Sequence, residues 1–260
     1  MNIRLQLFEL EDQRWFPHVI RQGMLDFLRF MISKLNAYET AVPLLKILLE
    51  KTGQDRIVDL CSGAGGGIEV IQADLSKAMD KSVSVTLTDL YPNTESYEYL
   101  QAQTDGQINY ISEPVNALAV PETLMGVRTI FSSFHHFTPT QARAILQDAA
   151  TKRKAIGIFE GADKSWLEVL LLWVFFPAII LVVTPFIRPF KWSSIFFTYF
   201  IPIIPAGILW DGTVSLLRIY TPEMLTQMAS TVQVQHYTWQ AGKAGDRPGK
   251  KVIYLIGYPD

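Results

Sequence analysis

The sequence has little of what several classes of protein require. A single cysteine in 260 residues excludes an internal disulfide framework and a cysteine-rich zinc site. Lys and Arg total 23 against 25 Asp and Glu, for a formal net charge of −2, and no run rich in Lys and Arg occurs. Without a basic surplus we expect no nucleic-acid partner. In the first twelve residues apolar and polar side chains alternate and acids occur, whereas a signal peptide has an uninterrupted apolar core. We therefore expect the protein to stay in the cytoplasm.

A regular alternation of strand-like and helix-like segments fills most of the chain. It predicts a three-layer α/β fold with a mostly parallel seven-stranded sheet and an antiparallel C-terminal edge strand. The expected strands are 56–60, 83–89, 107–111, 127–132, 155–160, 232–240 and 251–258. The expected helices are two within 17–52, broken near Asn36, then 67–80, 93–103, 138–153 and one from Pro222. We divide the chain into an N-terminal helical cap, 1–52, and a main domain, 53–260, with an apolar helical insertion at 164–212.

The most informative segment is the glycine-rich turn after the first strand. An apolar run ends at Asp59, and Gly63 and Gly65 follow before a helix-like stretch. Glycine lets the backbone approach a ligand, and the free N–H groups of the first helical turn face it. The next acid at a strand end, Asp89, lies 24 residues after Gly65. A parallel β-α-β unit places a carboxylate for a ribose at about this distance.

Two ligand classes use this geometry. The dinucleotide fingerprint G-x-G-x-x-G fails, because Ile68 stands where the third glycine belongs. The segment resembles instead the class I S-adenosylmethionine-dependent methyltransferase signature, an acid followed by x-G-x-G-x-G. Asp59, Gly63 and Gly65 match that signature, and Cys61 stands where the first glycine is usual. The resemblance implies a Rossmann-like methyltransferase fold and S-adenosylmethionine as the cofactor.

The resemblance covers about residues 56–159 and implies roles for the strand ends. Asp89 would bind the ribose hydroxyls and Leu90 would pack on the adenine, with a helix N-terminal acid as the alternative for Asp89. Asn116 and Ala117 stand where the family often contacts the adenine, and an asparagine carbonyl can accept that hydrogen bond; an ordinary loop is the alternative. The cofactor-binding residues expected are Asp59, Cys61, Ser62, Gly63, Ala64, Gly65, Asp89, Leu90, Asn116, Ala117 and Ser132.

Adjacent histidines, His135 and His136, follow the fourth strand. The family places residues there that border the sulfonium and the methyl acceptor. Methyl transfer requires alignment, exclusion of water and sometimes removal of a proton, and the last task suits histidine. We expect His135 or His136 to be catalytic, with helix capping or packing as the alternative. We expect no metal site, because no cluster of further ligands is evident beside them in the sequence.

Residues 166–209 are the most unusual part of the chain. Two apolar runs, 166–187 with one charge and 195–209 with two prolines, flank a tip that contains Arg188 and Lys191. The first run is long enough to span a bilayer and the second spans poorly. A spanning hairpin would also carry Arg188 and Lys191 to the outer side, against the positive-inside tendency.

We therefore expect this apolar hairpin to lie in the membrane interface or over the active site, which makes the protein peripheral or monotopic. One alternative is a buried insertion, covered by the body of the protein or by a partner subunit over residues 166–209. A second alternative is integral attachment to the membrane through residues 166–187.

These features together predict methyl transfer to a small lipophilic acceptor at or near a membrane. The hairpin follows the fifth strand and so lies beside the expected acceptor position. A rival from another class is a membrane-associated binding or scaffold protein with a degenerate, non-catalytic cofactor pocket, which Cys61 and Asn116 favour. A local salt bridge and a helix cap are the alternative for Asp211 and Arg218. The acceptor-side residues expected are Trp15, Phe16, Glu160, Asp211 and Arg218.

Overall fold

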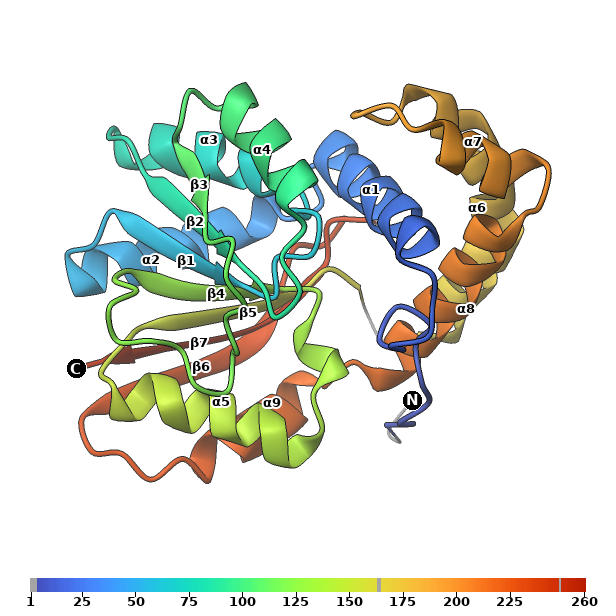
Figure 1. Ribbon diagram of the computed structural model, residues 1–260. Helices are drawn as coiled ribbons and strands as arrows, with labels where there is room; N and C mark the ends of the chain where they lie inside the picture. The colour runs from blue at the N-terminus through green and yellow to red at the C-terminus, as the bar shows by residue number, and fades with distance from the viewer. Residues whose placement is uncertain (1–3, 163–164, 248) are drawn as a thin grey trace.

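The computed structural model describes residues 4–162, 165–247 and 249–260. The described strands form one seven-stranded sheet in the order β3-β2-β1-β4-β5-β7-β6 (Figure 1). Strands β1 to β5 are parallel, and β7 is antiparallel to both β5 and β6. The strands are β1 (Arg56–Leu60), β2 (Ser84–Thr88), β3 (Ile108–Tyr110), β4 (Val127–Phe131), β5 (Ile156–Glu160), β6 (Tyr237–Ala244) and β7 (Val252–Pro259).

The predicted mostly parallel sheet is confirmed, and the closing hairpin differs in one detail. Strand β7 inserts between β5 and β6, so the edge strand is β6 rather than the last strand of the chain. Strand β6 also runs to Ala244, because Ala241 still pairs with Leu255 and Ala244 with Val252. Its predicted start at residue 232 is wrong, and the strand begins at Tyr237.

Helices cover both faces of the sheet (Figure 1). On one face α2 (Val42–Thr52), α3 (Ile68–Met79) and α4 (Thr94–Gln103) share a core with β1 and β2. On the other face α5 (Pro139–Thr151) and α9 (Pro222–Ser230) pack on β4, β5 and β7. The three-layer prediction is therefore confirmed.

Local sequence explains where these helices begin and end. Helix α1 (His18–Leu35) stops at Asn36, which takes the left-handed conformation at φ 45°, as the predicted break requires. Thr138 caps α5 and forms a capping box with Gln141. Short 3-10 turns also occur at η1 (Glu39–Ala41), η2 (Phe134–His136) and η3 (Thr184–Phe186).

The apolar insertion folds as α6 (Trp166–Val183), α7 (Trp192–Tyr199) and α8 (Ile203–Arg218). Helices α7 and α8 bend by 80° at the break between them. Pro202 is the N-cap residue of α8 at this break. That the second apolar run spans poorly stays a prediction. The predicted start of the insertion, residue 164, lies outside the described residues.

Helix α1 packs against this insertion and lies between it and the sheet (Figure 1). Gly23 allows the close contact, since a Cβ atom there would lie 2.5 Å from Ile204 Cδ1. Met24 and Phe27 complete a shared core with Ile180 and Ile208. The cap helix and the insertion therefore form one packed unit beside the carboxyl edge of the sheet.

Candidate functional site

The glycine-rich turn lies at the carboxyl end of β1, as predicted. The Ser62 N–H donates to Thr88 O at 3.0 Å, which joins the turn to the end of β2. Gly65 has φ 90°, and a Cβ atom on it would lie 2.2 Å from Leu100 Cδ1. Only glycine fits this position, because both the conformation and the space exclude a side chain.

The Asp59 carboxylate holds the turn against the sheet. It is 3% exposed, and it accepts hydrogen bonds from Ser62 Oγ and Thr129 Oγ1, each at 2.6 Å. Burial raises the pKa of Asp59 to about 7, although the two hydroxyl donors favour its charged form. The structure thus gives Asp59 a role in bracing the turn, and its direct contact with a cofactor stays a prediction.

Asp89 is joined to the turn across the end of the sheet. Its Oδ2 accepts the Gly63 N–H at 3.0 Å, and its Oδ1 accepts the Tyr91 N–H at 2.8 Å. Burial raises the pKa of Asp89, while these backbone donors oppose the shift. The predicted ribose acceptor and the predicted glycine loop are therefore in direct contact. The Leu90 side chain next to them is 44% exposed.

The remaining predicted cofactor residues lie in the turns at the strand ends. Cys61 and Ser132 both have positive φ, and Ser132 Oγ forms a hydrogen bond with the Tyr38 hydroxyl and accepts the Gly161 N–H. They therefore shape the backbone at the ends of β1 and β4. Asn116 Oδ1 accepts the Leu118 N–H at 2.9 Å, which closes a local turn. One lone pair of this oxygen remains, so the contact of Asn116 with the adenine stays a prediction beside the ordinary-loop alternative. Ala64 and Ala117 are buried beside these turns.

Glu160, at the end of β5, fixes the orientation of His135. Glu160 Oε1 accepts the backbone N–H of His135 at 2.9 Å, and its Oε2 lies 2.8 Å from His135 Nδ1. Both residues are buried. A carboxylate at Nδ1 places the proton there and leaves the lone pair on Nε2. That Nε2 atom is buried and has no hydrogen-bond partner among the described residues.

His136 has a different environment. Its Nδ1 lies 2.9 Å from Asp12 Oδ1. Burial alone would lower the pKa of His136, but the carboxylates of Glu9, Asp12 and Glu11 outweigh it and raise the pKa to about 10. His136 is therefore a cation near neutral pH, and the geometry favours His135 as the histidine that acts on an acceptor.

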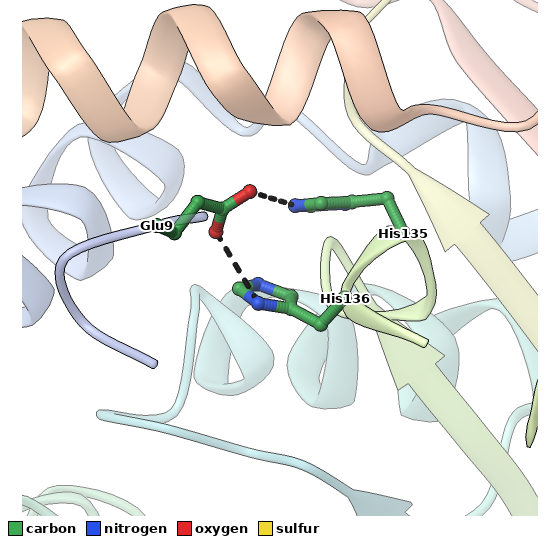
Figure 2. A group of neighbouring side chains, drawn as sticks. All are labelled: Glu9, His135 and His136. Carbon is green, nitrogen blue, oxygen red and sulfur yellow. Dashed lines mark ion pairs between the residues drawn. The ribbon is translucent and has the colours of Figure 1, made fainter. Parts of the chain in front are cut away.

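Glu9 completes this group, and sequence reasoning did not identify it as a site residue. The residue is fully buried and faces both imidazole rings from one side (Figure 2), while the rings stack on each other with their centroids 4.5 Å apart. Glu9 Oε1 is 3.7 Å from His135 Nε2, and Glu9 Oε2 is 3.2 Å from His136 Nδ1. The donor atoms of Glu9, His135 and His136 all lie within 4.8 Å of one another and could hold a metal ion.

Asp211 and Arg218 hold the N-terminal segment over the site. Asp211 accepts the N–H groups of Leu10 and Glu11 at 2.7 and 3.1 Å. Arg218 Nη1 lies 3.1 Å from Glu9 Oε1, and its Nη2 donates to His136 O at 2.6 Å. The alternative of a local salt bridge is wrong, because these contacts join α8 to residues about 200 positions away.

The predicted acceptor-side residues are thus only partly brought together. Glu160, Asp211 and Arg218 belong to one polar network around the histidines. Phe16 is buried in the core shared by α1 and the insertion, and Trp15 is 69% exposed. The sequence feature that could have indicated this network is the group of acids in the first twelve residues, Glu9, Glu11 and Asp12. No basic residue near them in the sequence identifies their partners.

The strand order, the glycine-rich turn and the strand-end acid define the fold of the class I S-adenosylmethionine-dependent methyltransferases. Solved structures agree. The CMeT domain of the citrinin polyketide synthase matches with a TM-score of 0.50 and 14% identity, over 89% of this chain and 55% of that one. No protein-family model and no curated protein matches the sequence.

Two further solved structures are similar. The methyltransferase domain of bacterial CtHen1 has a TM-score of 0.48 and 11% identity, over 87% of this chain and 100% of that one. The O-methyltransferase NcsB1 from neocarzinostatin biosynthesis, solved in complex with S-adenosylmethionine, has a TM-score of 0.45 and 13% identity, over 84% and 56%. The chain spans about half the length of two of these three structures.

Proposed function

We propose that the protein transfers a methyl group from S-adenosylmethionine to a small lipophilic acceptor at or near a membrane. The observation that carries this proposal is the contact between Gly63 and Asp89 at the carboxyl edge of the sheet. There, a glycine turn open to close approach and a carboxylate suited to two hydroxyls lie side by side. Gly65 fits the same role, since no side chain could occupy its place.

The protein's part in the reaction is to bind, align and exclude water. When bound, the cofactor supplies a methyl group already activated on a sulfonium. Asp89 would hold the ribose and the turn at Gly63 would approach the rest of the cofactor. Glu160 positions His135, whose Nε2 would act on the acceptor. The buried network around Glu9 closes that side of the site to solvent.

The surface of the insertion supports a membrane location. The stretch Trp166–Phe186, 21 residues long, passes the length and composition criteria for crossing a membrane, and only 17% of its apolar window is buried. Large apolar side chains are exposed along all three helices. The more exposed ones are Leu167, Leu170, Val174, Val182, Phe186, Trp192 and Phe200. A patch of this kind is typical of contact with lipid or a partner.

The position of the hairpin tip supports a monotopic arrangement over a spanning one. Lys191 Nζ lies 2.9 Å from Asp26 on α1 and 3.2 Å from Glu95 on α4. The tip therefore stays on the body of the protein, where α7 and α8 pack against α1 and α6 packs against α8. A spanning hairpin would have to break these ion pairs and withdraw from the core around Phe27.

Calorimetric titration with S-adenosylhomocysteine tests the cofactor half of the proposal. We expect one equivalent to bind. No binding at millimolar ligand would favour the rival hypothesis, in which the protein is a binding or scaffold protein with a degenerate cofactor pocket. That rival draws support from Cys61, which stands where the first glycine of the signature is usual.

Flotation with liposomes tests the membrane half. The wild-type protein should float, and the variant Leu170→Ser/Val174→Ser/Phe200→Ser should not, because it removes exposed apolar area without touching the core. Met125→Ser is the matched control, since Met125 is 51% exposed and lies outside the insertion. Equal flotation of all three proteins, or of none, would reject the monotopic proposal.

A further inference from the structure

We propose that Glu9, His135 and His136 bind a divalent transition-metal cation of the Zn²⁺ or Mn²⁺ class. Their donor atoms lie within 4.8 Å of one another (Figure 2). Two neutral imidazoles and one carboxylate form a ligand set that suits these ions and leaves coordination positions open. Because His136 carries a proton near neutral pH, the ion takes the place of that proton, which is released to solvent. The sequence predicts no metal here because it shows no further ligand beside the histidines, and the fold supplies that ligand from the N-terminal segment.

Unpaired atoms inside the group provide independent support. Glu9 Oε2 and His135 Nε2 are both buried and make no hydrogen bond among the described residues; each has only an ion-pair contact, Oε2 with His136 Nδ1 at 3.2 Å and Nε2 with Glu9 Oε1 at 3.7 Å. Their residues are 0% and 3% exposed, respectively. A buried polar atom without a hydrogen bond is costly, and both atoms belong to residues whose donor atoms lie within 4.8 Å of one another. A cation between them would satisfy both atoms.

The surroundings of His135 match those of a metal ligand. Glu160 Oε2 lies 2.8 Å from His135 Nδ1. A carboxylate in this position fixes the tautomer, directs the Nε2 lone pair at the ion and raises the basicity of the ligand. The backbone N–H of His135 donates to the other oxygen of Glu160, so the ring is held from two sides.

The charges around the group also favour a cation. Five carboxyl groups face it or one another, of which burial raises the pKa of Glu11 to about 8, and two arginines and the His136 cation oppose them. Arg218 already contacts Glu9, but through Oε1, which leaves Oε2 for the ion. The carboxylates are Glu9, Glu11, Asp12, Glu160 and Asp211, and the arginines are Arg4 and Arg218.

This metal site does not rest on the proposed function, because binding needs neither a methyl donor nor an acceptor. With the ion bound, His135 Nε2 is a ligand and no longer a base. The metal-free and metal-loaded proteins would therefore act on an acceptor by different means. A protein that binds the ion but no S-adenosylhomocysteine would keep this inference and lose the function.

Titration of the chelator-treated full-length protein with Zn²⁺ tests the inference. We expect one equivalent at sub-micromolar Kd. Glu9→Gln and His135→Asn should each weaken binding at least 100-fold. Glu160→Gln, which alters only the partner of a ligand, should weaken it about 10–100-fold. His18→Gln/His236→Asn is the control, because it removes the other two histidines of the sequence and should leave the affinity unchanged.

Cobalt(II) provides a second measurement that does not depend on the variants. The wild-type protein should develop the visible absorption of Co²⁺ with nitrogen ligands, and one equivalent of Zn²⁺ should abolish it. No stoichiometric Zn²⁺ binding and no Co²⁺ spectrum would overturn the inference. Loss of binding only in His18→Gln/His236→Asn would also overturn it, since the ion would then sit on surface histidines.

Discussion

Lys191, near the tip of the apolar hairpin, forms a 2.9 Å ion pair with Asp26 in the first helix. Asp26 is 1% exposed, and Ser96 Oγ on α4 donates to it at 3.3 Å. The contact joins two segments 165 residues apart. It fastens the hairpin to α1 and, through Glu95 and Ser96, to α4, whose Leu100 lies against Gly65 of the glycine-rich turn.

Loss of the Lys191 amine should therefore destabilise the protein. Lys191→Met leaves the buried Asp26 carboxylate with one hydroxyl donor, and removing one partner of a buried pair costs about 3–5 kcal/mol. Asp26→Asn/Lys191→Met should recover most of this loss, because no buried charge remains. Chemical denaturation measures both free energies of unfolding. Equal stability of Lys191→Met and wild type would show that this ion pair does not hold the tip.

Replacement of Asp89 should weaken cofactor binding. Asp89→Ala removes an acceptor of charge-assisted hydrogen bonds, and we expect a loss of about 1.5–3 kcal/mol in the free energy of binding S-adenosylhomocysteine. The measurement is calorimetric titration. Asp89→Asn is the control for local structure, since its side-chain oxygen can still accept the Gly63 N–H. Unchanged affinity in a folded Asp89→Ala protein would remove Asp89 from the cofactor site.

The two histidines should differ in their effect on turnover. His135→Ala should slow methyl transfer by on the order of 10²–10⁴-fold, the range for a group that acts directly on a reacting proton, with cofactor affinity unchanged. His136→Ala should act mainly on stability, because His136 belongs to an ion network with Asp12 and Glu9. Radiolabelled S-adenosylmethionine incubated with lipid extract gives the assay. A larger loss of turnover in His136→Ala would reverse this assignment.

The buried Asp59 should make stability depend on pH. Burial raises its folded-state pKa to about 7 from 3.8. The stability that Asp59 contributes is then fully present below the unfolded pKa and is lost as the pH rises through about 7. Relative to Asp59→Asn, the wild type should lose up to about 1.4 kcal/mol per pH unit between these two values. Denaturation at several pH values measures the difference, and parallel curves would contradict the prediction.

The fold and the meeting of the glycine-rich turn with Asp89 could be predicted from the sequence. Strand–helix alternation, capping residues such as Thr138, and the glycines at 63 and 65 act over a few residues, so they are visible in a linear chain. The juxtaposition of Gly63 and Asp89 also follows, because adjacent parallel strands end at one edge of the sheet. Strand boundaries failed at β6, where cross-strand pairing decided the limits.

The polar network around His135 and His136 could not be predicted from the sequence. Glu9 reaches the histidines because Asp211 and Arg218, about 200 residues later, bind its segment. No local pattern encodes a contact of that separation. The raised pKa of His136 and the absence of a hydrogen bond at His135 Nε2 both arise where the N-terminal segment, the turn after β4 and helix α8 meet. Burial and electrostatics depend on what surrounds a group in space, and the chain alone specifies only what precedes and follows it.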